Sequence, residues 1–283
     1  MGSLTAIWQH QGLRVPRAHL VLGSVLAGAW PPNGPQDSKA CASPTAPRWE
    51  LKLELPFAEV DGLVPATAPG HKGRYLVYQN SETRATVSVQ VGRLHGYEGH
   101  SAETAVAPVQ FMRELGVEHF VLTNAAGSLQ RHHRQGSAMI IRDHVNLTGR
   151  NPLIRPIASG PRFPDMMAAY DAQSSDELKC VLLAESLQVS EGVYLGILGP
   201  SFETPAEVRL FSKWGLDAVG FSTVWETIQL RQMGATVVGV SLISNMGCGL
   251  ESDRPLDHFQ FENECQQAAA YLARGLWNYL IKV

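Results

Sequence analysis

The sequence predicts a single α/β domain, spanning residues 1–283, in which helices flank a central β-sheet. Short apolar segments rich in β-branched residues alternate along the chain with segments of helical periodicity. The 283 residues are 45% hydrophobic and 17% charged, which is enough to bury one large core. Because no internal repeat and no linker interrupts this alternation, we expect one domain and not two.

The first predicted strand, "AHLVL" at residues 18–22, lies in a segment with two interpretations. Residues 14–30, "RVPRAHLVLGSVLAGAW", place arginines before a short apolar stretch and small residues, as a signal peptide does. The alternative is a buried strand that runs into a Gly/Ser loop. The rest of the chain alternates strands and helices in the same way, so we favour the strand.

The later elements follow from their apolar patterns. Residues 31–48, rich in Pro, Ser and Ala, predict a long irregular surface loop. Predicted strands occupy residues 49–55, 73–79, 83–91, 118–123, 137–145, 192–198, 217–221 and 236–243. Predicted helices occupy residues 101–115, 165–189, 204–214, 224–233 and about 257–280.

Two helix starts carry a capping-box pattern. Thr204-Pro205-Ala206-Glu207 places a proline at the first helical position, and Thr223 with Glu226 repeats the spacing. Glu203 therefore lies in a tight turn between a buried strand and a helix. Open α/β sheets bind their ligands at such carboxyl ends of strands, which makes Glu203 a candidate site residue. The alternative, which this stretch alone leaves open, is a carboxylate in a solvated loop.

Composition excludes several classes of partner. Lys and Arg total 23 against 26 Asp and Glu, and the net charge of −3 comes without runs of like charge, so we expect no nucleic-acid or membrane partner. The four cysteines lack metal or redox spacing and predict free thiols in a cytoplasmic protein without a metal site. The segment "RHHRQ" at 131–135 predicts a solvated turn.

Several predicted strands end in small residues with one or two polar side chains. These ends are "LGS" (22–24), "GRLHGYEGH" (92–100), "TNAAGS" (123–128), "GPSFET" (199–204), "GFSTV" (220–224) and "SNMG" (244–247). Small residues let backbone N–H groups approach an anion, and Arg93 and His95 add charged donors. Together the segments predict a phosphate site.

In these motifs the sequence resembles the trimeric purine nucleoside phosphorylases, a family that includes the methylthioadenosine phosphorylases. The matching segments are "PGHKGR", "GRLHGYEG", "TNAAGSL", "IRDHVNL", "PRFPDM", "GPSFETPAE", "FSTVWE" and "SLISN". The resemblance extends from about residue 18 to residue 280. It implies an α/β domain around a mixed, partly barrel-like sheet, active sites near subunit boundaries, and a homotrimer.

The resemblance also implies a role for individual residues. The phosphate-binding positions are Ser24, His71, Arg93, His95, Asn124, Ala125 and Ser222. The nucleoside-binding positions are Tyr97, Ala125, Phe163, Phe202, Glu203, Phe221, Asn245 and His258, with Phe163 donated across the trimer interface. Asn245, Glu203 and His95 are the expected catalytic residues. No cofactor is expected, and inorganic phosphate is the co-substrate.

The pairing of Glu203 with Asn245 predicts the substrate class. Asn245 would donate to the O6/N7 edge of a purine, where negative charge develops as the glycosidic bond breaks, and Glu203 would accept from N1–H. Adenine has no N1–H and would leave a buried carboxylate unpaired, so 6-oxopurine nucleosides are favoured. A purine nucleoside hydrolase with a weakened phosphate site and a non-catalytic purine-binding protein are the alternatives.

The first phosphate loop departs from the family's Gly-Ser-Gly-x-Gly pattern. Here it reads Gly23-Ser24-Val25-Leu26-Ala27. Because a β-branched residue resists positive φ, we expect the loop to hold phosphate less tightly, with a raised KM for phosphate. The alternative is that the family's glycines serve packing and that Val25 fills space. Trp225 stands where the family usually has Pro, and we expect it to pack within a helix.

Overall fold

The computed structural model describes residues 2–31, 49–157, 159–250, 261 and 264–283. Most of the predicted surface loop at 31–48, and the predicted ribose contact His258, lie outside the described residues. Among the described residues no helix has the length and apolar composition needed to cross a lipid bilayer.

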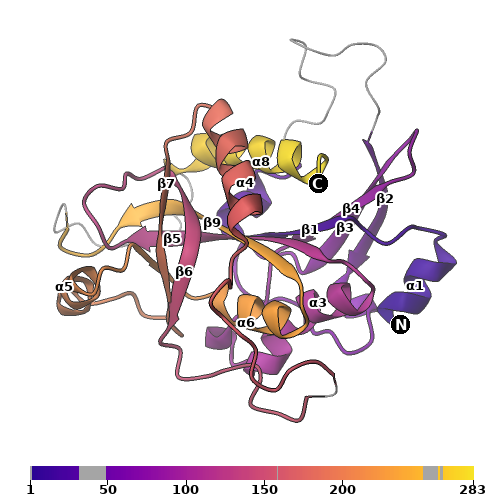
Figure 1. Cartoon of the computed structure of the whole chain (residues 1–283), viewed down its shortest axis with the longest axis horizontal. Helices are drawn as coiled ribbons and strands as arrows, with labels where there is room; N and C mark the ends of the chain where they lie inside the picture. The colour runs from indigo at the N-terminus through magenta and orange to yellow at the C-terminus, as the bar shows by residue number, and fades with distance from the viewer. Residues whose placement is uncertain (1, 32–48, 158, 251–260, 262–263) are drawn as a thin grey trace.

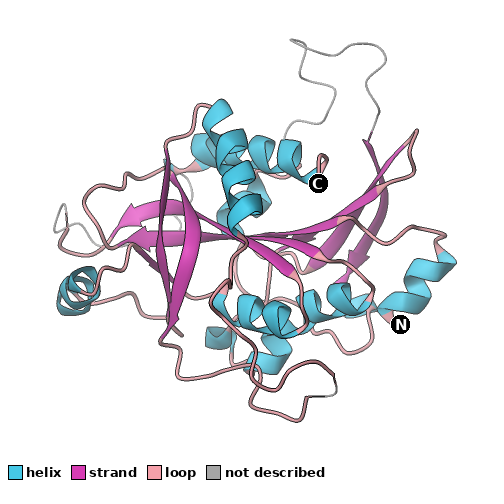
Figure 2. Cartoon of the chain, viewed as in Figure 1, coloured by secondary structure: helices cyan, strands magenta, loops and turns pink. Residues whose placement is uncertain are grey.

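A nine-stranded mixed sheet forms the centre of the molecule (Figures 1 and 2). The strands are β1 Ala18–Leu22, β2 Trp49–Pro56, β3 Arg74–Asn80, β4 Thr86–Val91, β5 His119–Ser128, β6 Ala138–Asn146, β7 Val189–Gly196, β8 Ala218–Gly220 and β9 Thr236–Met246. Their order is β2-β3-β4-β1-β5-β8-β7-β6-β9, and β5 also pairs with β9. This second pairing closes β5, β8, β7, β6 and β9 into a barrel, so the expected mixed, partly barrel-like sheet is confirmed.

Strand β5 belongs to both parts of the sheet. It runs parallel to β1 on one side and parallel to β9 on the other, and its carboxyl end pairs antiparallel with β8. Its apolar residues from Phe120 to Leu122 are almost fully buried, because helices cover both faces. Strand β1, with all five residues buried, confirms the strand interpretation of residues 18–22.

Helices cover the two faces of the sheet (Figure 2). The helices are α1 Leu4–His10, α2 Ser24–Gly28, α3 Ala102–Glu114, α4 Ala172–Ala184, α5 Pro205–Lys213, α6 Val224–Gln232 and α8 Gln266–Leu280, with short 3-10 turns at Phe57–Glu59 and Gly96–Glu98. Helices α3 and α6 pack together on one face, and α4 and α8 pack together on the other. One apolar cluster lies on each face, and a smaller one lies beneath α5.

Helix α5 begins as its sequence predicts. Thr204 accepts a hydrogen bond from the Glu207 N–H, the Glu207 carboxylate accepts one from the Thr204 N–H, and Pro205 takes the first helical position. Glu203 directly precedes this cap, and the strand-to-helix turn therefore fixes its backbone. The predicted capping box is confirmed.

Other expectations were wrong in detail. Residues 165–171 are not helical, since the only helix of the predicted 165–189 segment is α4. Helix α1 was not predicted, and α2 replaces the expected Gly/Ser loop. Thr223 does not cap α6 with its side chain: it has φ 73°, and its hydroxyl instead accepts a hydrogen bond from Asn124.

Candidate active site

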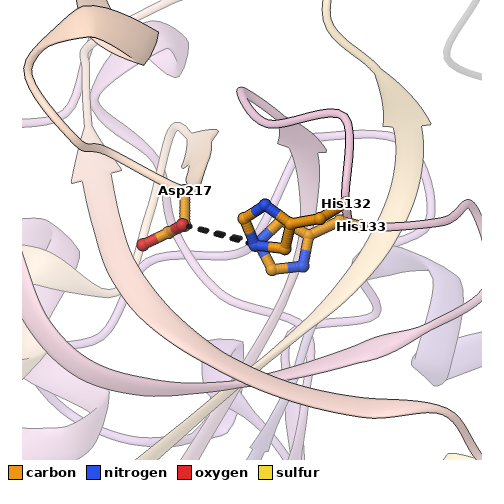
Figure 3. Close-up of side chains that lie close together, drawn as sticks. All are labelled: His132, His133 and Asp217. Carbon is orange, nitrogen blue, oxygen red and sulfur yellow. Dashed lines mark ion pairs between the residues drawn. The ribbon is translucent and has the colours of Figure 1, made fainter.

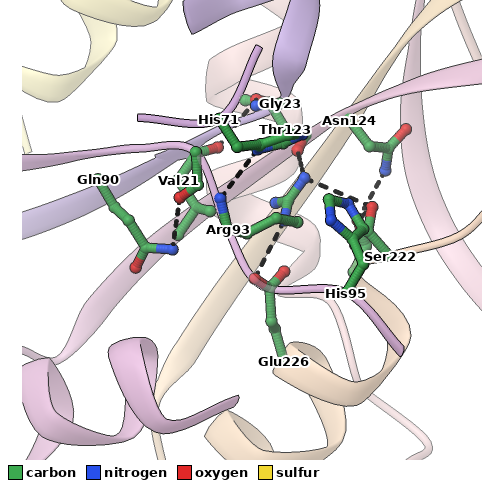
Figure 4. Close-up of polar contacts among 12 residues, drawn as sticks. Val21, Gly23, His71, Gln90, Arg93, His95, Thr123, Asn124, Ser222 and Glu226 are labelled. Carbon is green, nitrogen blue, oxygen red and sulfur yellow. Dashed lines mark hydrogen bonds and ion pairs between the residues drawn. The ribbon is translucent and has the colours of Figure 1, made fainter. Parts of the chain in front are cut away.

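The predicted phosphate residues gather around the middle of β5. Arg93 lies just after β4. Strand β1 lies between β4 and β5 and runs parallel to both, so β4 and β5 end at the same edge of the sheet. Strand β8 pairs antiparallel with the carboxyl end of β5, with Gly127 opposite Val219. The residues that follow β8 therefore lie beside the middle of β5, near Asn124. Ser222 therefore comes close to Arg93, although the two residues are 129 positions apart (Figure 4).

Arg93 is the centre of this cluster and is only 1% exposed. Its Nε donates to Glu226 Oε1 at 3.1 Å, and its Nη1 donates to the Thr123 carbonyl at 2.6 Å and to Ser222 Oγ at 3.4 Å. Its Nη2 is buried and has no hydrogen-bond partner among the described residues. A buried guanidinium N–H without a partner is costly, and an anionic ligand would satisfy it.

The backbone beside this cluster is tightly packed. The Gly23 N–H donates to Thr123 Oγ1 at 3.1 Å, and the same hydroxyl donates to the Val21 carbonyl at 2.8 Å. A Cβ on Gly23 would lie 3.1 Å from the Asn124 Cα, so a side chain would crowd β5 at this point. Gly23 thus lets β1 and β5 approach each other beneath the predicted site.

The altered first loop has a different conformation from the one we expected. Residues Ser24–Gly28 form the short helix α2, and neither Val25 nor Ala27 has positive φ. Both side chains are buried in the apolar cluster shared with α8. The expectation that Val25 strains this loop was therefore wrong, because the residue occupies ordinary helical backbone. Ser24, at the start of α2, stays partly exposed.

A row of rings continues from the arginine. His71 Nδ1 accepts a hydrogen bond from the Arg93 backbone N–H at 2.9 Å. The His71 and His95 rings meet edge to face at 4.7 Å between centroids, and His95 stacks on Tyr97 at 4.6 Å. Tyr97 in turn meets Phe221 edge to face at 6.0 Å. The predicted phosphate and ribose residues thus form one continuous surface.

Burial and the neighbouring charge of Arg93 lower the pKa of His95, although its hydrogen bond to Glu98 acts in the opposite direction. Glu98 Oε1 accepts from the His95 backbone N–H at 2.7 Å and lies 3.2 Å from its Nδ1. Burial raises the pKa of Glu98, but hydrogen bonds from His95 and Thr67 outweigh it and hold that pKa well below its usual range. A charged Glu98 therefore orients the His95 ring.

Sequence reasoning missed the roles of Glu98 and Glu226. Glu98 stands three residues after His95, a spacing that closes a turn, and that spacing was the available signal. Glu226 was assigned to a helix cap, but it lies in the almost wholly buried helix α6 and pairs with Arg93. A carboxylate within a buried apolar helix needs a charged partner, so burial of α6 would have indicated this pairing.

The predicted base residues come from two other elements. Phe202 and Phe221 lie 6.2 Å apart between ring centroids, and Glu203 is buried beside the start of α5. Burial raises the pKa of the Glu203 carboxyl, and the charge of Glu207 adds to this shift. The raised pKa indicates a carboxylate held in a site of low polarity.

Asn245 owes its orientation to an irregularity in β9. The register on β5 shifts between Ala126 and Gly127, so that Ile243 pairs with Ala126 and Asn245 pairs with Gly127. Ser244 Oγ donates to Asn245 Oδ1 at 2.9 Å, which fixes the amide with its oxygen toward Ser244. The Asn245 Nδ2 donates to the Met246 carbonyl at 3.2 Å.

Two predicted residues behave differently from this cluster. Phe163 is 89% exposed, in the connection between β6 and α4, as a residue that acts on a neighbouring subunit would be. Trp225 is buried, and its Nε1 donates to Thr148 Oγ1 at 2.9 Å, in agreement with a packing role.

The chain is similar to a known protein family over most of its length. The family model of the phosphorylase superfamily matches residues 40–281. A purine nucleoside phosphorylase 1 of Geobacillus stearothermophilus is 45% identical over 211 residues, which cover 74% of this chain and 76% of the relative. A purine nucleoside phosphorylase of Mycobacterium tuberculosis is 44% identical over 204 residues, which cover 72% of each chain.

Solved structures are similar over almost the whole length. The purine nucleoside phosphorylase of Schistosoma mansoni in complex with adenosine has a TM-score of 0.81 at 29% identity, covering 98% of this chain and 94% of that chain. A Schistosoma purine nucleoside phosphorylase in complex with guanosine has a TM-score of 0.80 at 28% identity, with the same coverage of both chains. The chain therefore belongs to the phosphorylase superfamily and, within it, to the purine nucleoside phosphorylases, enzymes that cleave purine nucleosides with phosphate.

Proposed function

We propose that this enzyme cleaves 6-oxopurine nucleosides, inosine and guanosine with their 2′-deoxy forms, into the free base and a pentose 1-phosphate. Phosphate is the co-substrate, and the reaction requires no metal or organic cofactor. The observation that carries the proposal is the buried Arg93, whose Nη2 has no partner among the described residues while its other nitrogens are fixed by Glu226, Thr123 and Ser222.

The phosphate step rests on positioning. A guanidinium held on both sides keeps its orientation before phosphate binds, so little freedom is lost on binding. The Glu226 carboxylate offsets part of the Arg93 charge. The charge that remains suits a bound anion and not a second acidic side chain. Ser222 Oγ supplies a further donor, and His71, whose Nδ1 accepts from the Arg93 backbone N–H, carries its own proton on Nε2. His95 adds a donor when the bound anion favours its protonated form, because its Nδ1 is already directed at Glu98.

The base step rests on Asn245 and Glu203. With its oxygen turned toward Ser244, the Asn245 amide presents Nδ2 as a donor to the O6/N7 edge, where charge develops. Glu203 accepts from purine N1–H and, in guanosine, from the 2-amino group. Both interactions are lost or reversed with a 6-aminopurine, which gives the preference for 6-oxopurines. Tyr97 and Phe221 form the surface beneath the sugar.

The two alternatives are disfavoured by the same arginine. A nucleoside hydrolase activates water, and a purine-binding protein needs only the base pocket, so neither needs a buried cation with an unsatisfied N–H. Product analysis from inosine decides among them. We expect ribose 1-phosphate that appears only when phosphate is added. Free ribose formed at the same rate without phosphate would support the hydrolase, and no product would support the binding protein.

A further inference from the structure

A second polar cluster lies outside the active site, between the β5–β6 connection and β8 (Figure 3). His132 Nε2 lies 3.8 Å from Asp217 Oδ1, and His133 Nε2 lies 3.6 Å from the same oxygen. The two imidazole rings lie side by side, with 4.1 Å between their centroids. The expected solvated turn at 131–135 is confirmed for its other four residues, which are exposed, but it was wrong for His133, whose side chain is 1% exposed.

The hydrogen bonds around His133 assign its proton. Ser190 Oγ lies 3.0 Å from His133 Nδ1 and donates its only hydrogen to the Ala138 carbonyl. The hydrogen between Ser190 and His133 must then come from Nδ1, so neutral His133 carries a lone pair on Nε2. That nitrogen is buried and has no hydrogen-bond partner among the described residues.

The Asp217 carboxylate is also fixed in place. Its Oδ2 accepts from the Val193 N–H at 2.8 Å, which turns Oδ1 toward the histidines. A Cβ on Gly192 would lie 2.6 Å from the Asp217 carboxylate, so only glycine lets the strands approach closely here. In neutral His133, a lone pair on Nε2 therefore faces a carboxylate oxygen with no hydrogen between the two atoms. This arrangement is repulsive unless a cation lies between the two atoms.

We propose that His132, His133 and Asp217 form a zinc site that fastens the β5–β6 connection to the start of β8. Two nitrogens and one oxygen within 4.8 Å of one another match a tetrahedral zinc site with water as the fourth ligand. Zinc bonds of about 2.0–2.2 Å place ligand atoms roughly 3.3–3.6 Å apart, close to the present separations. Imidazole ligands favour zinc over magnesium or calcium. Ser190 acts as the partner that holds His133 in the ligating tautomer.

The site differs from the active site in location and in effect. Asp217 precedes β8, whereas Phe221 and Ser222 follow that strand, so the bound ion would stabilise the strand and not touch substrate. His132 is the ligand to change first, because its side chain is 63% exposed and its removal leaves the core intact. His10, an exposed histidine in α1, provides a matched control.

The test uses the untagged, chelator-treated chain and zinc chloride alone. We expect equimolar binding by calorimetry and a rise in Tm of about 5 °C at a free zinc concentration a hundred times the Kd. His132→Ala should weaken zinc binding by about 100-fold or more and remove most of the rise, while His10→Ala should keep both. Cobalt(II) should give the visible absorption of a tetrahedral site in the wild type and not in His132→Ala.

A second variant separates zinc from a simple ion pair. Asp217→Asn replaces a repelling oxygen by an N–H donor, so without zinc it should be at least as stable as the wild type, and zinc should no longer raise its Tm. The proposal is overturned if zinc raises the Tm of His132→Ala as much as that of the wild type, which would place the ion elsewhere. It is equally overturned if zinc has no effect and Asp217→Asn loses stability, because the cluster would then be an ion pair of protonated histidine.

Discussion

Two buried carboxylates of the active site have pKa values shifted in opposite directions. Hydrogen bonds from Thr67 and His95 outweigh burial and lower the pKa of Glu98, so this residue is a fixed charge that orients His95. Burial raises the pKa of Glu203, and the one backbone hydrogen bond that acts in the opposite direction does not outweigh it. Glu98 therefore contributes to the structure of the free enzyme, whereas Glu203 keeps an acceptor available for the base contact that we propose.

Glu203→Gln tests this difference. Because the folded pKa of Glu203 is raised, its contribution to stability is present at acid pH and is lost as pH rises through that pKa. The variant should therefore match or exceed wild-type Tm where Glu203 is ionised, and this advantage should disappear on acidification. Its kcat/KM should fall by about 10–100-fold, more for guanosine than for inosine, because the glutamine amide repels the 2-amino group. Thermal melts and initial rates across pH give both readouts, and an unchanged guanosine rate contradicts the assignment.

Asn245→Ala should reduce catalysis without affecting folding. One donor placed against developing negative charge is worth about 10²–10³ in rate, so kcat/KM for inosine and guanosine should fall by that factor. Ser244 Oγ loses one acceptor but retains the Ala126 carbonyl at 3.3 Å, so the stability cost stays small. Urea unfolding should give a midpoint close to that of the wild type. Activity within a few-fold of the wild type would contradict the proposed base contact.

Asn245→Asp should change the preferred base. The serine hydroxyl can still donate to one carboxylate oxygen, while the other becomes an acceptor where the amide was a donor. An acceptor suits the 6-amino group of adenine, so the ratio of kcat/KM for adenosine to that for inosine should rise. Rates with both nucleosides, measured at saturating phosphate, provide the comparison. An unchanged ratio would count against the pocket described above.

At the scale of secondary-structure elements, helix α2 shows how an altered motif is accommodated. Val25 and Ala27 stand where the family pattern has glycines, yet the segment has helical backbone and buries both side chains. The residues that replace glycine therefore add apolar contacts with α8 instead of strain. This leaves no steric reason for glycine to improve phosphate binding.

The double variant Val25→Gly/Ala27→Gly should lose stability by about 2–4 kcal/mol, from helix propensity and lost burial. Its KM for phosphate should stay level or rise, because the glycines loosen α2 without freeing a strained amide. Val25→Ala, which removes burial without lowering helix propensity, is the control and should lose less. Urea unfolding and phosphate titrations at saturating inosine provide the measurements. A lower KM at unchanged stability would restore the strained-loop hypothesis.

Elements with a local cause were predictable from the sequence. The cap of α5 and the presence of a strand within residues 83–91, observed as β4, depend on neighbouring residues and were confirmed. The pairing of Arg93 with Glu226 joins residues 133 positions apart, and the closure of the barrel depends on a second pairing of β5. Neither leaves a periodic signal, so the residue types of the site were predictable from family motifs while their hydrogen bonds were not. The contact of His133 with Asp217 also joins residues that are far apart in the sequence, so it too could not be predicted from local patterns.

At the scale of the whole molecule, the connection between β6 and α4 carries three of the most exposed large apolar side chains among the described residues. Ile154, Phe163 and Met167 are 71%, 89% and 94% exposed. Large apolar groups that lie together on a surface indicate a contact with another chain. We expect the homotrimer that the family resemblance implies, with Phe163 covering the sugar site of a neighbour.

Phe163→Ala tests the assembly and its link to catalysis together. If the ring closes a neighbour's sugar site, its loss should raise the KM for inosine by roughly ten-fold, while the KM for phosphate changes little, because the proposed phosphate donors are Arg93 and Ser222 and not this ring. Trp214→Ala, which removes a ring that is 57% exposed at the end of α5, is the matched control and should leave both constants unchanged. Sedimentation velocity should give a trimer for the wild type and for the control. A fully active monomer would refute the assembly. If the protein is a trimer but Phe163→Ala keeps the wild-type KM for inosine, the ring belongs to the interface and does not reach the substrate.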